Sequence, residues 1–134
     1  MMKGSPSFIL IDDNFINGYI AEKILKGMGL KDSITSFMDA NKALEYIRTN
    51  RNEDMQKTIL LVDLQMPMMS GFSFLEVFEQ LPSGVRNHYA VYIVTSSINQ
   101  EDQRQAYKYP SVKRFLSKPL TASIVQEIID ETYS

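Results

Sequence analysis

Acidic residues follow two short apolar runs of this sequence. Asp12 and Asp13 come directly after SFILI, and Asp63 comes directly after TILLV. If the two runs are neighbouring parallel strands, their carboxyl ends bring the three carboxylates together. Such close like charges must take up protons or bind a cation, and Mg2+ prefers oxygen ligands of this kind. The pattern therefore predicts a Mg2+ (or Mn2+) site at Asp12, Asp13 and Asp63.

A hydroxyl and an ammonium group end two further apolar runs. Thr95 follows YAVYIV, and Lys118 follows KRFLS and precedes Pro119. A metal ion, an ammonium and a hydroxyl together suit a phosphoryl group, whose charge must be neutralised during transfer. An aspartate can act as the nucleophile and form an acyl phosphate. The residue types therefore favour phosphoryl chemistry.

Five strands that alternate with helices must position these residues. We expect strands at 7–11, 33–37, 58–62, 89–94 and 113–117. We expect helices at about 15–28, after the capping residues Asp39 and Ser70, at about 100–108 and at about 122–133. The first, third and fourth strands are almost wholly apolar, as strands covered on both faces are. The second and fifth are more polar, as edge strands can be. This predicts an α/β flavodoxin-like doubly wound (βα)5 sandwich with a parallel sheet in the order 2-1-3-4-5.

The helices carry apolar residues at helical spacing. In the first helix we expect an apolar face of Ile16, Ile20 and Ile24, with Leu25 and Met28 beside them. In the third helix we expect Phe72, Leu75 and Phe78 on the inner face. His88 is expected at the surface, in a polar loop.

Composition excludes several classes of site. The 134 residues have a net charge of -2, no cysteine and one histidine. Disulfides, thiolate catalysis and cysteine-bound zinc are therefore ruled out. There is no basic excess for nucleic acid and no apolar run of the 18 or so residues that a membrane span needs. We expect a soluble, cytoplasmic protein without nucleic-acid contact or membrane insertion.

Four segments together resemble the receiver domain of two-component response regulators. ILIDDN is similar to the acidic pair of that family, and LLVDLQMPMMSG to its phosphoacceptor motif, D-x-x-M-P-x-M-x-G. IVTSS is similar to its hydroxyl-bearing strand end, and FLSKP to its lysine–proline signature. The resemblance covers essentially the whole chain, with the motifs in the family's order.

The resemblance implies a role for each acidic residue. Asp63 would accept a phosphoryl group from a histidine kinase or a phosphotransfer protein. Asp13 and Asp63 would bind the metal directly, together with the backbone carbonyl of Gln65, and Asp12 would act through a metal-bound water.

The resemblance also implies a switch. Lys118 would pair with Asp63 and then with the phosphoryl group, while Thr95 would move toward that group and Phe115 would rotate inward. Ser96, where the family often has alanine, is small enough to leave access to the site. The Lys118–Pro119 bond would be cis.

Two departures from the family leave questions open. Gln65 replaces more familiar side chains two residues after the acceptor, and its effect on dephosphorylation has no predicted sign. Pro110 and Ser111 replace a glycine-containing turn before the fifth strand. The effect of the segment 107–111 on the output surface is therefore open.

We expect a single receiver domain over residues 1–134, with a core at about 6–133 and no output domain. It would be a regulatory phosphoacceptor rather than an enzyme, and a protein partner would bind the face formed by the fourth helix, fifth strand and fifth helix. No recognisable motif identifies the cognate kinase, the downstream target or the pathway. Nor does any motif indicate the lifetime of the phosphate or the oligomeric state.

Three alternatives remain to be tested. The first is a receiver-like interaction module that works without phosphorylation. A haloacid-dehalogenase-like phosphohydrolase would need a second acid at Gln65, and a flavin-binding flavodoxin would need a phosphate loop where DDNFING stands.

Overall fold

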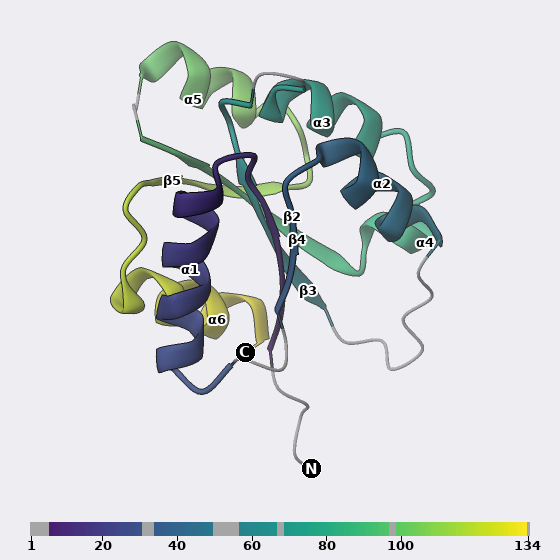
Figure 1. Ribbon diagram of the computed structural model, residues 1–134. Coiled ribbons are helices and arrows are strands. Elements are labelled where there is room, and N and C mark those ends of the chain that lie inside the picture. The colour runs from purple at the N-terminus through teal and green to yellow at the C-terminus, as the bar shows by residue number, and fades with distance from the viewer. Residues whose placement is uncertain (1–5, 31–33, 50–56, 67–68, 97–98, 134) are drawn as a thin grey trace.

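A five-stranded parallel sheet forms the centre of the computed structural model (Figure 1). The structure describes residues 6–30, 34–49, 57–66, 69–96 and 99–133. The strands lie in the order β2-β1-β3-β4-β5. Their bounds are β1 Ser7–Ile11, β2 Ile34–Phe37, β3 Thr58–Asp63, β4 Tyr89–Thr95 and β5 Val112–Ser117. The predicted fold class and strand order are confirmed.

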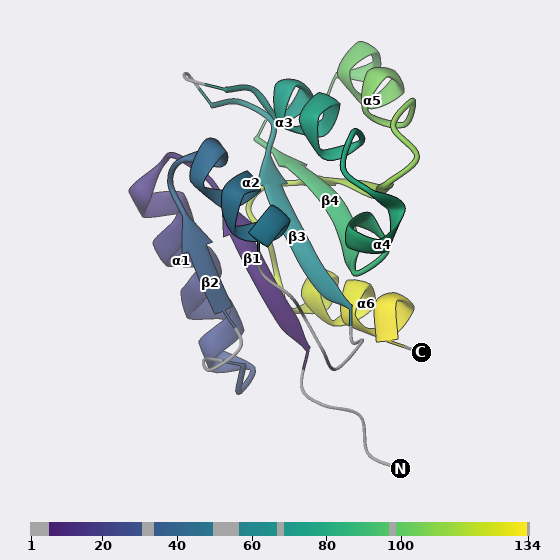
Figure 2. The ribbon, with the colours of Figure 1, turned by 90° about the vertical axis from the view of Figure 1, so that its right-hand side faces the viewer.

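Helices cover both faces of the sheet (Figures 1 and 2). One face carries α1 (Phe15–Gly27) and α6 (Ala122–Tyr133). The other carries α2 (Ala40–Thr49), α3 (Gly71–Phe78), α4 (Ser83–Arg86) and α5 (Gln100–Ala106). Among the described residues, no helix combines the length and apolarity that crossing a membrane requires.

The alternation of side chains along each strand divides the core into two parts. Leu60 and Val62 of β3 point into the cluster beneath α2, α3 and α5, whereas Ile59 and Leu61 point into the cluster beneath α1 and α6. All six residues of β3 are buried. The third strand is thus covered on both faces along its whole length, including Asp63 at its carboxyl end.

The predicted inner face of α1 is wrong in its first turns. Ile16 and Ile20 are 65% and 45% exposed, while Leu25 is the buried residue of this helix. Ala21 and Ile24 pack beside Leu25. The segment carries apolar residues on several sides, so periodicity alone could not select the line that faces the sheet.

Other differences concern the remaining helices. In α3, Leu75 and Phe78 are fully buried as predicted, whereas Phe72 is only partly buried. Phe74, which the prediction did not include, is fully buried. The helix α4 was not expected, because four residues are too short to show a helical period. His88, expected at the surface, is half-buried. Its backbone carbonyl accepts a hydrogen bond from the Thr58 N–H at the start of β3.

Most boundaries differ from the prediction by one or two residues. β3 and β4 each include one more residue, Asp63 and Thr95, and β5 begins at Val112. α1 ends at Gly27 and α5 at Ala106. Ser33, the predicted start of the second strand, lies outside the described residues.

Candidate functional site

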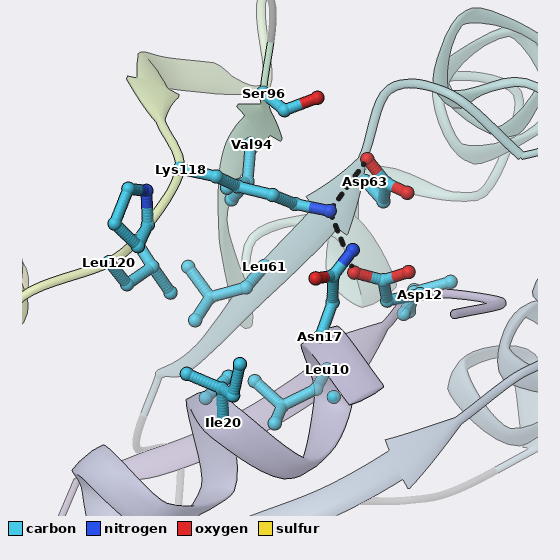
Figure 3. A pocket seen from close by; sticks show the side chains of 14 residues that line it. Leu10, Asp12, Asn17, Ile20, Leu61, Asp63, Val94, Ser96, Lys118 and Leu120 are labelled. Carbon is cyan, nitrogen blue, oxygen red and sulfur yellow. Dashed lines mark hydrogen bonds and ion pairs between the residues drawn. The ribbon is translucent and has the colours of Figure 1, made fainter. Parts of the chain in front are cut away.

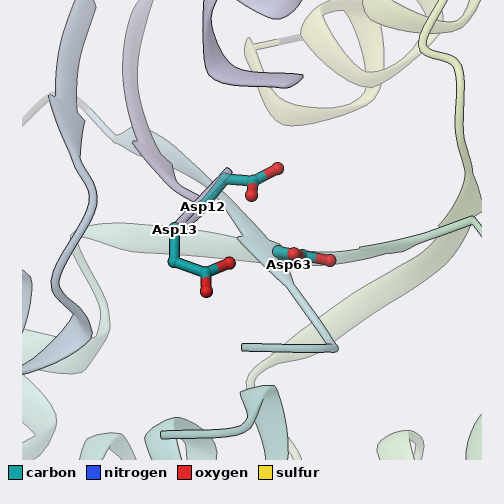
Figure 4. A group of neighbouring side chains, drawn as sticks. All are labelled: Asp12, Asp13 and Asp63. Carbon is teal, nitrogen blue, oxygen red and sulfur yellow. The ribbon is translucent and has the colours of Figure 1, made fainter. Parts of the chain in front are cut away.

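The register of β1 and β3 places Asp12 beside Asp63. Ile11 pairs with Val62, so the next residue of each strand lies at the same level of the sheet edge. On the other side of β1, the Asp12 N–H donates to the Phe37 carbonyl at the end of β2 at 3.1 Å, which holds the backbone of Asp12 at the sheet edge. Oxygen atoms of Asp12, Asp13 and Asp63 all lie within 4.8 Å of one another (Figure 4). The three predicted carboxylates therefore do converge.

Lys118 reaches this cluster from the far edge of the sheet. Its Nζ donates to Asp12 Oδ2 at 2.9 Å and lies 3.3 Å from Asp63 Oδ1 (Figure 3). Its backbone N–H donates to the Thr95 carbonyl at 2.8 Å, which fixes the start of the side chain above the end of β4. The prediction paired Lys118 with Asp63, whereas the structure shows the shorter contact with Asp12.

Negative charge exceeds positive charge in this site. Three carboxylates face one ammonium group, and the Asp63 side chain is only 7% exposed. Burial, and secondarily the charge of Asp12, raise the pKa of Asp63 to about 6 although Lys118 acts in the opposite direction. Because the carboxylates carry more charge than Lys118 can neutralise, the site favours a further cation.

The loop after Asp63 is closed by a tight glycine contact. The Gly71 N–H donates to the Leu64 carbonyl at 2.8 Å, and a Cβ at Gly71 would lie 2.9 Å from the Leu64 Cα. The Gln65 N–H lies 3.4 Å from Asp63 Oδ1, and the Gln65 side chain is exposed. Met66 is buried, while Pro67 and Met68 lie outside the described residues. The packing role of Gly71 was missed, although its place at the end of the acceptor motif could have indicated it.

The residues of the predicted switch lie along β4 and β5. Thr95 is fully buried and Phe115 is 7% exposed. The Phe115 N–H, on the free edge of β5, donates to the Tyr107 hydroxyl at 3.1 Å. Ser96 is exposed beside Lys118 (Figure 3). The Lys118–Pro119 peptide bond, expected to be cis, is cis.

Polar contacts also hold residues 107–111, the segment before β5 in which Pro110 and Ser111 replace the family's glycine-containing turn. The Ser111 N–H donates to the Glu79 carboxylate at 2.9 Å, and Arg86 lies 3.5 Å from the same side chain. Tyr109 packs against the core, whereas Tyr107 is 49% exposed. Glu79 thus supplies the acceptor for a backbone N–H in the turn.

The donor set fits a hard divalent cation. Three carboxylates within 4.8 Å match the oxygen ligands and the negative charge that Mg2+ requires. Asp12 is additionally held by the Asn14 N–H at 2.9 Å, so its orientation is set before any ion arrives.

Comparison with known proteins agrees with this geometry. The family model of the response regulator receiver domain matches residues 8–130. The chain belongs to this family. Receiver domains are regulatory domains of two-component signalling rather than conventional enzymes, and they typically bind Mg2+ at an acidic pocket.

Solved receiver domains share the fold over nearly the whole chain. The response regulator receiver protein from Dyadobacter fermentans is 30% identical, with a TM-score of 0.86 and coverage of 96% of this chain and 98% of that chain. The two-component response regulator from Cytophaga hutchinsonii is 25% identical, with a TM-score of 0.85 and coverage of 97% and 98%.

Curated relatives place similar receiver domains in proteins of different size. Two-component response regulator 24 of Arabidopsis thaliana is 26% identical, and the match covers 90% of this chain and 79% of that protein. Hybrid signal transduction histidine kinase I of Dictyostelium discoideum is 23% identical, with 93% and 7% covered. The chain spans 7% to 33% of the length of the first three such relatives, two of which are hybrid signal transduction histidine kinases.

Proposed function

We propose that Asp63 is the phosphoacceptor of a two-component phosphorelay. The observation that carries this proposal is the position of its carboxylate: buried at the end of β3, beside Asp12 and Asp13, and within 3.3 Å of the Lys118 ammonium. The donor would be the phosphohistidine of a sensor kinase or a phosphotransfer protein. Related receiver domains in histidine kinases support this class of donor.

The transfer exchanges one bond to phosphorus for another. The N–P bond of the phosphohistidine breaks and its electron pair stays on the imidazole nitrogen, while a bond forms between phosphorus and an Asp63 oxygen. Mg2+, held by Asp12, Asp13, Asp63 and the Gln65 carbonyl, would neutralise charge on the phosphoryl oxygens. Lys118 lies close enough to Asp63 to exchange its carboxylate contact for a phosphoryl oxygen.

The proposed response to phosphorylation passes through buried residues. A phosphoryl group adds strong hydrogen-bond acceptors directly beside the end of β4. Thr95 would donate its hydroxyl to it, with Ser96 leaving room for access, and Phe115 would adjust on the neighbouring strand, where Thr95 pairs with Ser117. The face formed by α5, β5 and α6 would then change shape and bind a protein partner. These elements are the fourth helix, fifth strand and fifth helix of the sequence prediction, because the short α4 was not counted there.

The surface beside the acidic cluster suits a protein donor. Four large apolar side chains are exposed in the first turns of α1: Phe15, Ile16, Tyr19 and Ile20. This helix begins directly after Asp12 and Asp13, so a donor histidine brought to Asp63 would come within reach of these residues. Such exposed apolar clusters are typical of protein-binding surfaces.

The proposal is tested with a small acyl phosphate and Mg2+. We expect a phosphate adduct on the unaltered protein by intact-mass spectrometry, and none on Asp63→Asn. Asp130→Asn, an exposed acid on α6, is the matched control and should retain the adduct. An undiminished adduct on Asp63→Asn contradicts the assignment of the acceptor. No adduct on the unaltered protein favours an interaction module that works without phosphorylation.

A further inference from the structure

An apolar cavity lies directly beneath the Lys118 side chain (Figure 3). Its volume is about 300 Å³. It extends between the first half of α1, the carboxyl ends of β1, β3 and β4, and Leu120 after β5. Leu10, Leu61 and Val94 supply its floor, on the side of the sheet that faces α1 and α6.

Small residues on α1 leave this space open. Gly18 and Ala21, one turn apart, line the cavity where larger side chains would occupy it. A Cβ at Gly18 would meet no heavy atom within 4 Å. Protein interiors are otherwise close-packed, with few voids larger than a water molecule. Larger side chains at Gly18 and Ala21 would therefore take up part of this space.

The rim of the cavity is polar and carries net negative charge. Asp12, Asp63 and Lys118 line it together, with the ammonium lying between the two carboxylates. The Lys118 ammonium is thus already occupied by two carboxylates, and an anionic ligand would meet both of them. A positively charged group would instead meet an excess of negative charge, because two carboxylates face one ammonium. Asp12 already accepts hydrogen bonds from Lys118 and the Asn14 N–H, but each carboxylate oxygen can accept a further one.

The size of the cavity limits what it can hold. An apolar cavity of about 150 Å³ is enough to bind benzene, and ligand pockets begin at about 300 Å³. A single ring or a short branched chain with one polar substituent fits this range. The apolar floor and the acidic rim together specify the chemistry of both ends of such a molecule.

We propose that this cavity binds a small apolar amine, with its ring or chain against Leu61 and Leu120 and its ammonium group at Asp12. Because Asp12 also belongs to the cation site, amine and Mg2+ bind in competition. By linkage each weakens the other by the same factor. An amine of this class thereby opposes phosphorylation of Asp63 without touching the output face.

Benzylamine is the probe, with benzyl alcohol and benzoate as shape-matched neutral and anionic controls. In metal-free buffer we expect saturable binding of benzylamine, followed by amide NMR shifts at Gly18, Ala21 and Leu120. Benzoate should bind at least about tenfold more weakly. Saturating Mg2+ should raise the apparent Kd of benzylamine severalfold. Equal binding of benzoate, or indifference to Mg2+, overturns the assignment of the ammonium to Asp12.

Two glycines of the same helix give a matched pair of variants. Gly18→Met fills the cavity, whereas Gly27→Met adds the same side chain at an exposed position that is equally open and does not line it. We expect benzylamine affinity to fall at least about tenfold in the first and to be unchanged in the second. Ala21→Leu, which fills the space from the next turn, should reproduce the loss. Undiminished binding in both filled variants, or no saturable binding to the unaltered protein, overturns the proposal.

Discussion

The buried charge of Asp63 should lower the stability of the metal-free fold at neutral pH. Burial and the neighbouring Asp12 raise its pKa from 3.8 to about 6, so the folded protein binds the Asp63 proton more tightly than the unfolded chain does. The resulting stabilisation is present below about pH 4 and is lost as the pH rises through about 6. Each pKa unit corresponds to about 1.4 kcal/mol, so the ionised group costs about 3 kcal/mol at pH 7.

Asp63→Asn removes this charge and keeps the shape of the side chain. We expect the free energy of unfolding in EDTA at pH 7.5 to rise by about 2 to 3 kcal/mol, because Lys118 retains its 2.9 Å contact with Asp12. The gain should shrink as the pH is lowered from about 6 to about 4. Urea denaturation followed by far-UV circular dichroism measures both quantities, since the chain has no tryptophan.

Two comparisons make this result specific. Asp130→Asn makes the same change of charge at an exposed position of α6 and should alter the stability by less than about 0.5 kcal/mol. Saturating Mg2+ should stabilise the unaltered protein more than Asp63→Asn and so reduce the difference between them. A gain that is absent at pH 7.5, or equally large at pH 4, refutes the reasoning.

Three further substitutions test separate parts of the structure. Ile16→Lys should slow phosphoryl transfer from a phosphotransfer protein at least about tenfold by weakening its docking, while labelling by a small acyl phosphate, followed by intact mass, stays unchanged. Gly71→Ala should lower the free energy of unfolding by about 1 to 3 kcal/mol in urea, because its Cβ would lie 2.9 Å from the Leu64 Cα; Gly84→Ala, with open space around it, is the control. Tyr107→Phe should cost about 1 kcal/mol in the same assay, because the Phe115 N–H loses its acceptor; an unchanged midpoint would show that water replaces the hydroxyl at no cost.

The acidic cluster could be predicted because it depends on topology more than on side-chain packing. Once the strand order is known, the carboxyl ends of β1 and β3 must adjoin, and the residue after each strand follows directly. Asp12 and Asp63 thus meet whatever the details of the core. The Lys118 contact could be placed at the same edge for the same reason, but its preference for Asp12 over Asp63 depends on side-chain geometry.

Features that depend on packing choices were not predictable in the same way. The first turns of α1 carry apolar residues that could face the sheet or the solvent, and nothing in their spacing distinguishes the two. Phe72 and Phe74 present a similar ambiguity in α3, which only the position of the helix on the sheet decides. The cavity beneath Lys118 has no sequence signature either, since small residues such as Gly18 become informative only when their surroundings are known.

The Lys118–Asp12 contact joins residues 106 positions apart in the sequence. Closing a contact between such distant residues costs loop-closure entropy, which the pairing of the strands in between reduces. Lys118 follows β5, so its ammonium group reaches Asp12 only when the last strand has paired with β4. A chain emerging from the ribosome would carry Asp63 long before it carries the lysine that completes the site. The site with its lysine in place is therefore complete only when β5 has joined the sheet.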